Sequence, residues 1–493
     1  MTVTRTIRAN YFLNVGGMVL PLVAALITVP IYIHLIGAAR YGVLSIVWLL
    51  LGYFGFLDFG LSRASANALS RLSHENAAER VPVLVTSLYL NMALGLFGGL
   101  VLYGASSLLL AYAGSIPDAL RPEITSAMPW IATMLPIALI SAVGAGALES
   151  RERFMEANVL TTLSGVVGQV APVTCAWFFG PTLEVVIPAA FLARLLSTVL
   201  VWVLVAHIER PLDLRRFDRS RVRGLLGYGA WVSVTSVISP LLETLDQVLI
   251  GAMLGPASVA HYTVPMSLST RCLVVSSALA KTLFPRLSRL GRDDATLLAE
   301  RATMLLAYAF AGVCGPAIII AGPFLKLWVG PDFAAYSIPV AHILLVGAWC
   351  NGVAYIPYTL LQGQGRPDLT ARIHLAEILP FLALLWLLTT QFGLPGAALA
   401  WTIRVAADWV VLMLVSGFRK SQLLHFVPPT ICLAACWAIA GGTDLTLPGA
   451  MALAACVGLV LLVAALRLNP VAYGLYAEMM PRRLRPYLLG RVE

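Results

Sequence analysis

Long apolar runs alternate with short polar segments along the whole chain. The runs cover approximately residues 11–36, 41–62, 83–113, 124–148, 159–180, 183–208, 225–253, 258–280, 301–325, 338–361, 375–391, 396–416, 427–441 and 448–466. A helix that crosses the hydrocarbon core of a bilayer needs about 20 apolar residues, and open sheet edges are not tolerated in lipid. The pattern therefore predicts an all-α polytopic membrane protein with about 14 transmembrane helices.

The composition of the chain supports this class and argues against an enzyme. Of its 493 residues, 59% are hydrophobic and 12% are charged, whereas a soluble domain is about 25% charged. The seven Cys residues all lie within apolar runs and form neither a disulfide framework nor a metal motif. The longest segments predicted on the outer side, 114–123 and 326–337, are too short for a catalytic domain. We therefore expect no catalytic residues and no metal site.

The net charge of +9 carries information about orientation. Twenty-seven of the 33 Lys and Arg residues fall in the terminal segments and in every second loop between the predicted spans, where Arg301, at the first residue of its span, is counted with the loop before it. Positively charged loops stay on the cytoplasmic side, so both termini are predicted to be cytoplasmic. The densest cluster, residues 210–223, is then a loop between two spans, and the charge does not indicate a nucleic-acid partner.

An internal repeat relates the two halves of the chain. A shift of 218 positions places Gly37 on Gly255 and residues 61–72 on 279–290, where five of the twelve residues are identical. Six predicted spans separate the copies, so both halves enter the membrane in the same sense, as in parallel-repeat transporters. We predict two pseudo-symmetric six-helix bundles followed by two additional C-terminal helices. The expected limits are 1–208 for the first lobe, 209–224 for a basic linker, 225–416 for the second lobe, and 417–493 for the last two helices and the tail.

Short motifs in both halves carry a family resemblance. They are LIGAARYG at 35–42, LDFGL at 57–61, DQVLIG at 246–251, FPRLS at 284–288 and LQGQG at 361–365. These motifs resemble those of the bacterial oligosaccharide flippases, the Wzx-like polysaccharide-transport family of the multidrug/oligosaccharidyl-lipid/polysaccharide exporter superfamily, over about residues 10–420.

The resemblance implies a transporter of the bacterial inner membrane. Such a protein moves undecaprenyl-diphosphate-linked oligosaccharide repeat units from the cytoplasmic to the periplasmic leaflet by alternating access, for O-antigen, capsule or exopolysaccharide synthesis. Its implied partners are the lipid-linked oligosaccharide, membrane lipids, a polysaccharide polymerase and chain-length proteins. Two alternatives stay open: a multidrug or organic-cation antiporter of the same superfamily, and a lipid II flippase, whose basic pattern in the first two spans is not recognised here.

Three Arg residues in the apolar runs are candidates for binding the substrate diphosphate. Arg194, Arg271 and Arg404 lie near the middle of their predicted spans, where a charge is costly and normally faces a bundle interior or a cavity. The planar guanidinium group can contact two phosphate oxygens at once. Structural pairing is the alternative, with Asp408 one helical turn from Arg404 and Glu243 at a depth similar to that of Arg271.

Buried carboxylates in the second half are candidates for ion coupling. Glu243 and Asp246 are three residues apart and share a helix face, and Asp408 lies within the twelfth run. Buried carboxyl groups can take up protons, so these residues could couple transport to a proton or sodium gradient. Pairing with a neighbouring helix is an equally open alternative for them. No cofactor other than such an ion is expected.

Charged residues at the cytoplasmic ends of the spans are candidates for a gate. Asp58 and Arg63 end the second run, and Lys281 takes the place of Arg63 in the repeat. Glu377 and His374 fall close to the predicted end of the eleventh run, where interfacial residues are common. They receive no role from the sequence.

Overall fold

The structure is a computed structural model that divides into two compact units, Met1–Ala260 and His261–Glu493. The residues that it describes are 2–53, 61–70, 72, 77–112, 116–151, 153–223, 245–419, 424–443 and 445–468. The domain limits predicted near residues 208 and 225 stay a prediction, since residues 224–244 lie outside the described ranges. All regular structure within the described ranges is helical, which confirms the predicted all-α class.

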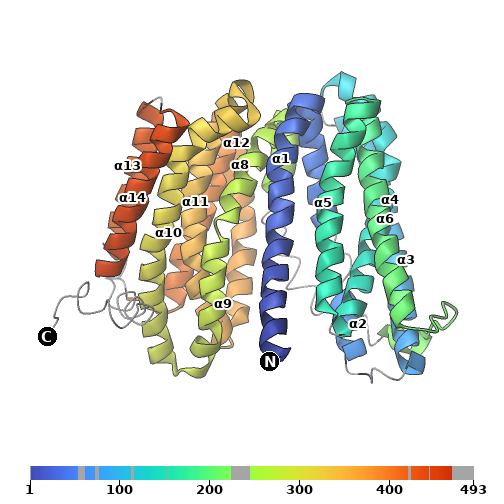
Figure 1. Cartoon of the computed structure of the whole chain (residues 1–493). Helices are drawn as coiled ribbons and strands as arrows, with labels where there is room; N and C mark the ends of the chain where they lie inside the picture. Colours follow the sequence, from blue (N-terminus) through green and yellow to red (C-terminus); the bar gives the residue numbers. More distant parts are fainter. Residues whose placement is uncertain are drawn as a thin grey trace. The chain divides into compact units, whose positions relative to one another are not determined.

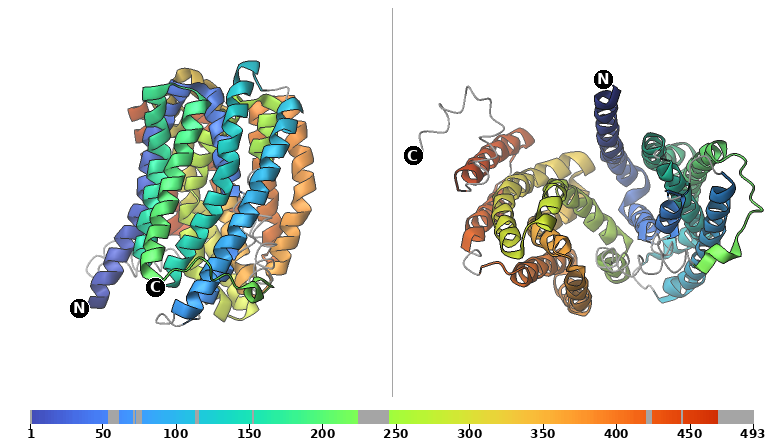
Figure 2. Two further views of the ribbon diagram at one scale, coloured as in Figure 1. Left: turned by 90° about the vertical axis from the view of Figure 1, so that its right-hand side faces the viewer. Right: turned by 90° about the horizontal axis from the view of Figure 1, so that it is seen from below.

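The helices of the first unit follow the predicted spans closely (Figure 1). They are α1 (Thr2–Tyr53), α2 (Leu61–Ser70), α3 (Ala77–Tyr112), the short 3₁₀ helix η2 (Asp118–Leu120), α4 (Arg121–Ser150), α5 (Phe154–Phe179) and α6 (Leu183–Ile208). A further apolar helix, Leu245–Leu254, and the first residues of α8 (Pro256–Arg271) complete the unit. The right-hand view of Figure 2 shows these helices end on.

The second unit contains the rest of α8 and six further helices. They are α9 (Val274–Arg289), α10 (Arg292–Val329), α11 (Pro331–Gly363), α12 (Pro367–Val415), α13 (Val427–Gly442) and α14 (Leu447–Leu468). Across the two units, nine helices in the described ranges are long and apolar enough to cross a membrane. The chain is therefore a multi-pass membrane protein.

Helix α1 contains two of the predicted spans, because it folds back at a glycine. Gly37 has φ 80°, a left-handed value that favours glycine. The Tyr32 ring, before this point, lies 5.9 Å from the Tyr41 ring and 5.8 Å from the Trp48 ring, both after it. The two arms must therefore run antiparallel. Gly255, which the repeat superposes on Gly37, has φ 86° and so makes the equivalent turn.

Helix α12 is a hairpin of the same kind, and its turn positions the main ionic cluster of the second unit. Gly393 has φ 63° and ψ −138°. An ion pair of 3.6 Å joins Glu377, before the turn, to Arg404, after it. Residues at equal distances from Gly393 on the two arms therefore lie at similar depths.

One predicted span is interrupted. The run 258–280 was expected to form a single helix, but α8 ends at Arg271 and α9 begins at Val274. The backbone N–H groups of Cys272 and Leu273 bond to carbonyls three residues back, as in a tight turn.

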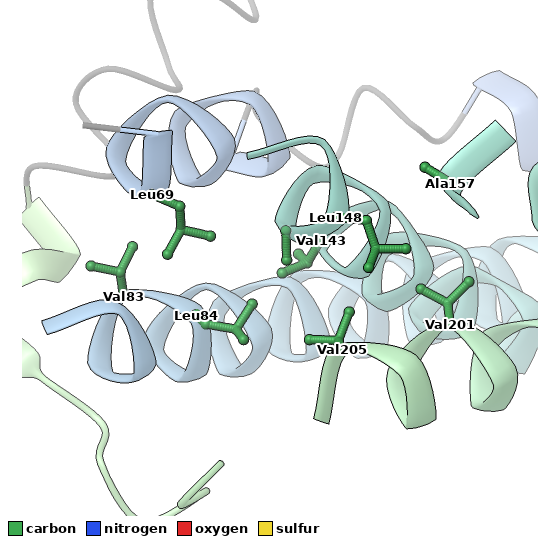
Figure 3. Close-up of a cluster of buried hydrophobic side chains, with 9 residues drawn as sticks. Leu69, Val83, Leu84, Val143, Leu148, Ala157, Val201 and Val205 are labelled. Carbon is green, nitrogen blue, oxygen red and sulfur yellow. The ribbon is translucent and has the colours of Figure 1, made fainter. Parts of the chain in front are cut away.

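A buried apolar cluster joins five helices at one end of the first unit. It brings together α2 to α6 through Leu69, Val83, Leu84, Val143, Ala147, Leu148, Ala157, Val201 and Val205 (Figure 3). Helix α2 contributes Leu69 to the cluster, so this packing helps to position it. The cluster thereby fixes the segment in which Arg63 was predicted to act.

Candidate functional site

Arg194 projects from the inward-facing stripe of α6. Residues Ile187, Ala190, Thr198 and Val201 lie one or two helical turns from it, on the same helix face, and all four are buried. Arg194 alone among these five is exposed. Its side chain forms no ion pair or hydrogen bond with another described residue, in contrast to most buried or inward-facing charges.

The opposite stripe of α6 has the character of a lipid-facing surface. Leu192, Leu196, Val199 and Val203 recur every three or four residues and are between 48% and 61% exposed. This stripe lies on the far side of the helix from Arg194, at about 100° per residue. The exposed side chain of Arg194 therefore faces the inward side of α6 and not the lipid side.

Uncharged polar groups lie at the same depth on the neighbouring helices. Gln169 of α5 and Arg194 of α6 are each about 15 Å from the turn that joins the two helices, at 1.5 Å per residue. Thr28 of α1 donates a hydrogen bond to Oε1 of Gln169 at 3.3 Å, and the Tyr32 hydroxyl donates one to its carbonyl oxygen at 2.8 Å. The middle of the first unit thus combines one unpaired cation with amide and hydroxyl groups suited to sugar hydroxyls.

Arg271 and Lys281 lie on either side of the interruption between α8 and α9. Both are exposed, and neither forms an ion pair with another described residue. Glu243, the predicted partner of Arg271, lies outside the described residues, as does Asp58. The side chain of Arg63 is likewise not described, so the Arg271 pairing and the gate assigned to Asp58, Arg63 and Lys281 stay predictions.

Asp246 is fully buried in the helix Leu245–Leu254. One carboxylate oxygen accepts a hydrogen bond from the backbone N–H of Gln247 at 2.7 Å, and the residue has further partners. A carboxylate held by its own helix in this way favours the structural alternative over ion coupling.

Arg404 pairs across the α12 hairpin. The spacing along the sequence favoured Asp408 as its partner, but the ion pair is made with Glu377 at 3.6 Å. The guanidinium carbon also lies 5.2 Å from the centre of the Phe381 ring, within cation–π range. Arg404 is therefore a paired residue of the second unit and a weaker candidate for the substrate diphosphate than Arg194.

Glu377 and Asp408 extend this pair into a cluster that the sequence did not reveal. Asp408 lies one helical turn after Arg404, the residue that pairs with Glu377, so both carboxyl groups belong to the same cluster. Asp408 also lies 3.7 Å from Nε2 of His374, whose ring stacks on Tyr358 of α11 with an interplanar angle of 7°. Both oxygens of Glu377 and one of Asp408 are buried without a donor from the described residues.

The distances of Glu377 and Asp408 from Gly393 along the sequence are enough to predict this cluster once the turn is known. Glu377 precedes Gly393 by sixteen residues, and Asp408 follows it by fifteen. At 1.5 Å per residue both lie about 23 Å from the turn, so a hairpin at Gly393 brings them level. The missing information was the reversal of the chain at that glycine.

A second network anchors the helix ends of the first unit. Arg80 of α3, which is fully buried, donates to Glu209 at 2.8 Å and to the carbonyl oxygen of Leu69, in α2, at 2.6 Å. Arg151 contacts the other oxygen of Glu209 at 2.7 Å. Burial acts to raise the pKa of Glu209, but the hydrogen bonds from Arg151 and Arg80 outweigh it and hold the pKa below its usual value. From the sequence alone, Arg80 and Arg151 are predicted only to be positive charges in cytoplasmic loops.

The other end of the first unit has its own ionic anchor. Arg40, three residues after the Gly37 turn, contacts both carboxylate oxygens of Glu123, at 2.6 and 2.8 Å. The same carboxylate accepts a hydrogen bond from the backbone N–H of Leu183, at the start of α6. Near this end, the backbone of α1 at Gly42 packs directly against the backbone at Pro256, just after the Gly255 turn. The contact is so close that a Cβ atom on Gly42 would overlap the carbonyl oxygen of Pro256.

Comparison with known proteins gives the context for this arrangement. A family model described as polysaccharide biosynthesis protein matches residues 7–291. A putative O-antigen transporter of Shigella flexneri is 28% identical over 407 residues, which are 82% of this chain and 96% of the relative. A probable low-salt glycan biosynthesis flippase, Agl15 of Haloferax volcanii, is 24% identical over 207 residues, or 40% of this chain and 43% of the relative.

Two solved structures share the fold. The lipid II flippase MurJ, in an inward closed conformation, superposes with a TM-score of 0.71 at 12% identity, covering 92% of this chain and 98% of MurJ. An inward-facing multidrug resistance transporter of the MATE family superposes with a TM-score of 0.62 at 16% identity, covering 86% of this chain and 99% of the other. At these identities the likeness concerns the fold alone, and it confirms the predicted polytopic all-α architecture.

Proposed function

The chain belongs to the polysaccharide biosynthesis protein family, and we propose that it flips undecaprenyl-diphosphate-linked oligosaccharide repeat units across the bacterial inner membrane by alternating access. The relative from Shigella flexneri is named as a putative O-antigen transporter and the one from Haloferax volcanii as a probable glycan flippase. Both names describe the handling of glycans at a membrane. The product would serve O-antigen, capsule or exopolysaccharide synthesis.

The observation that carries this proposal is the unpaired, inward-facing Arg194. A diphosphate cannot cross about 30 Å of hydrocarbon without compensation of its charge. Arg194 offers a permanent cation about halfway along α6, and within the described part of the chain no carboxylate pairs with it. The hydroxyl and amide groups around Gln169 lie at the same depth and can replace water around sugar hydroxyls. The lipid tail would stay outside, along the apolar stripes.

The drug-exporter alternative has less support in the first unit. An exporter of organic cations needs a surface that attracts positive charge, whereas the unpaired charge on the inward side of α6 is positive. The lipid II alternative shares the diphosphate and therefore the need for a cation. Lipid II supplied beside the oligosaccharide substrate in a transport assay separates these two cargoes.

The orientation and partners belong to the same proposal. The excess of Lys and Arg in every second loop favours cytoplasmic termini and entry of the substrate from the cytoplasmic leaflet. A polysaccharide polymerase and chain-length proteins would then use the flipped repeat unit on the periplasmic side. No chemical bond changes during flipping, so the protein would act as a transporter and not as an enzyme.

Complementation of a deletion strain tests the proposal. We expect wild type to restore surface polysaccharide, Arg194→Ala to abolish it, and Arg194→Lys to restore part of it, because Lys keeps the charge but loses the planar fork. Arg153→Ala is the matched control, since Arg153 is exposed and paired only with Glu156 within its own turn. Full activity of Arg194→Ala at wild-type protein level would remove Arg194 from the mechanism.

A further inference from the structure

We infer that Glu377 and Asp408 form a binding site for one proton, shared between the two arms of α12. Their carboxyl groups come from opposite sides of the Gly393 turn and belong to one cluster, with Arg404 at 3.6 Å from Glu377 and His374 at 3.7 Å from Asp408. A carboxylate has no hydrogen to donate, so two ionised groups cannot bond to one another. A hydrogen bond between the two groups therefore requires that one of them carries a proton.

The unsatisfied oxygens of the pair point to the same conclusion. The side chains of Glu377 and Asp408 are 15% and 13% exposed, so water has little access to them. Three of their four oxygens are buried and receive no hydrogen bond from an N–H or O–H group of the described residues. Buried polar atoms in native proteins nearly always have a partner. A shared proton supplies the donor that the carboxylate pair lacks.

The charges of the cluster balance when one proton is bound. Arg404 contributes one positive charge at 3.6 Å from Glu377, and the carboxyl pair with one proton contributes one negative charge. The cluster is then neutral within the apolar helices. Loss of the proton leaves a net negative charge and two repelling carboxylates, an arrangement that costs free energy in a low-dielectric region.

The surrounding titratable groups fit a proton better than a metal cation. Arg404 and His374 belong to α12 itself, and Tyr358 faces the cluster from α11, the helix packed along α12. A sodium ion would have to bind within a few ångströms of the Arg404 guanidinium group, where like charges repel. It would also find fewer oxygen ligands than hard cations prefer. His374, at 3.7 Å from Asp408, offers a neighbouring group through which a proton can enter or leave.

Protonation of the pair would change the attraction between the two arms of α12. With the proton, a hydrogen bond joins Glu377 on the first arm to Asp408 on the second. Without it, the two carboxylates repel each other and the arms are held at this level only through Arg404. The link from this switch to flipping rests on the proposed function, whereas proton binding itself does not.

Infrared spectroscopy of the full-length protein in lipid nanodiscs tests the site directly. Protonated carboxylic acids have a carbonyl band distinct from that of carboxylates. We expect wild type to show one such band near neutral pH and to lose it when the pH is raised. Glu377→Gln and Asp408→Asn should each abolish the band, while Asp332→Asn, which changes an exposed carboxylate at the start of α11, should leave it intact.

A substitution of Arg404, the positive charge beside the pair, distinguishes loss of the proton site from misfolding of the variants. Arg404→Gln removes the positive charge that favours the ionised pair, so we expect the band to persist to a pH about one to three units higher than in wild type. A band that is absent from wild type near neutral pH, or unchanged in both carboxyl variants, would overturn the proposal. So would loss of the band on exchanging choline chloride for sodium chloride at constant pH, since that would assign the site to sodium.

A transport assay distinguishes failure of this site from failure of the proposed function. In proteoliposomes, wild-type flipping should respond to a pH gradient, and Glu377→Gln should abolish that response because the amide stays uncharged at every pH. If wild type flips no oligosaccharide yet retains the infrared band, the proposed function fails and the proton site stands. If wild type flips but lacks the band, the proton site fails alone.

Discussion

The two units treat their buried charges in opposite ways. In the first unit, Arg80 and Glu209 lie at helix ends, are almost fully buried, and satisfy each other with hydrogen bonds of 2.8 to 3.3 Å. In the second unit, Glu377 and Asp408 lie within the α12 hairpin and have oxygens that receive no hydrogen bond from any residue the structure describes. Completely paired charges fix a structure, whereas incompletely paired ones are able to bind something further. The first network is thus an anchor and the second a binding site.

Arg194 does not follow this division between the units. It belongs to the first unit, yet it is the charge there that faces inward without a partner among the described residues. Its position on a stripe of buried residues separates it from the ionic anchors at the helix ends. The contrast that matters for function is therefore between charges with partners and charges without them.

Removal of the anchor at Arg80 should have the largest effect on stability. Arg80→Ala leaves Glu209 buried with only one of its two Arg partners among the described residues, and breaking a buried ion pair in this way typically costs about 3–5 kcal/mol. Thermal unfolding of the purified protein measures this change. Arg153→Ala, at an exposed pair, should cost no more than about 1 kcal/mol. Equal effects of the two substitutions would show that the buried network is not an anchor.

The anchor also predicts a pH dependence of stability. The folded-state pKa of Glu209 lies below its usual value, so its stabilising contribution is complete above the unfolded pKa, about 4.3 for Glu, and is lost as the pH falls through the folded value. Glu209→Gln should abolish this part of the acid sensitivity. Unfolding temperatures of both proteins across the acidic range provide the measurement. An identical slope in wild type and variant would place the acid-sensitive group elsewhere.

The smallest change in stability is expected at the proton site. Glu377→Gln keeps the shape, the hydrogen bond to Asp408 and the neutral charge of the protonated cluster, so unfolding should change by about 1 kcal/mol or less. The unfolding temperature near neutral pH checks this, beside that of Arg80→Ala. A loss as large as that of Arg80→Ala would indicate that Glu377 is also an anchor, and the contrast between the units would fail.

The fold was predictable from the sequence because the length of an apolar run is a direct physical requirement of the bilayer. The run 183–208, for example, coincides with α6. The interruption at Cys272 and Leu273 was not predicted, since neither Gly nor Pro marks it. The apolar run continues through the turn, so a hydropathy pattern does not detect it.

The candidate site was predictable only in part. Arg194 was identified because a charged residue within an apolar run is energetically costly and therefore indicates a function. This argument does not require knowing which helices pack beside it. The partner of Arg404 was missed, because spacing along one helix suggests Asp408 and only the Gly393 reversal brings Glu377 alongside. Contacts between the arms of a hairpin depend on where the chain turns, which hydropathy places within several residues at best.

The most direct test of the central claim is a flipping assay with purified protein in proteoliposomes. The substrate is a fluorescently labelled oligosaccharide on undecaprenyl diphosphate, and its accessibility to an added quencher reports the leaflet in which it lies. The account predicts rapid transfer by wild type, loss of transfer in Arg194→Ala and partial transfer in Arg194→Lys. Transfer by Arg194→Ala at the wild-type rate would contradict the claim that this unpaired cation carries the diphosphate across the membrane.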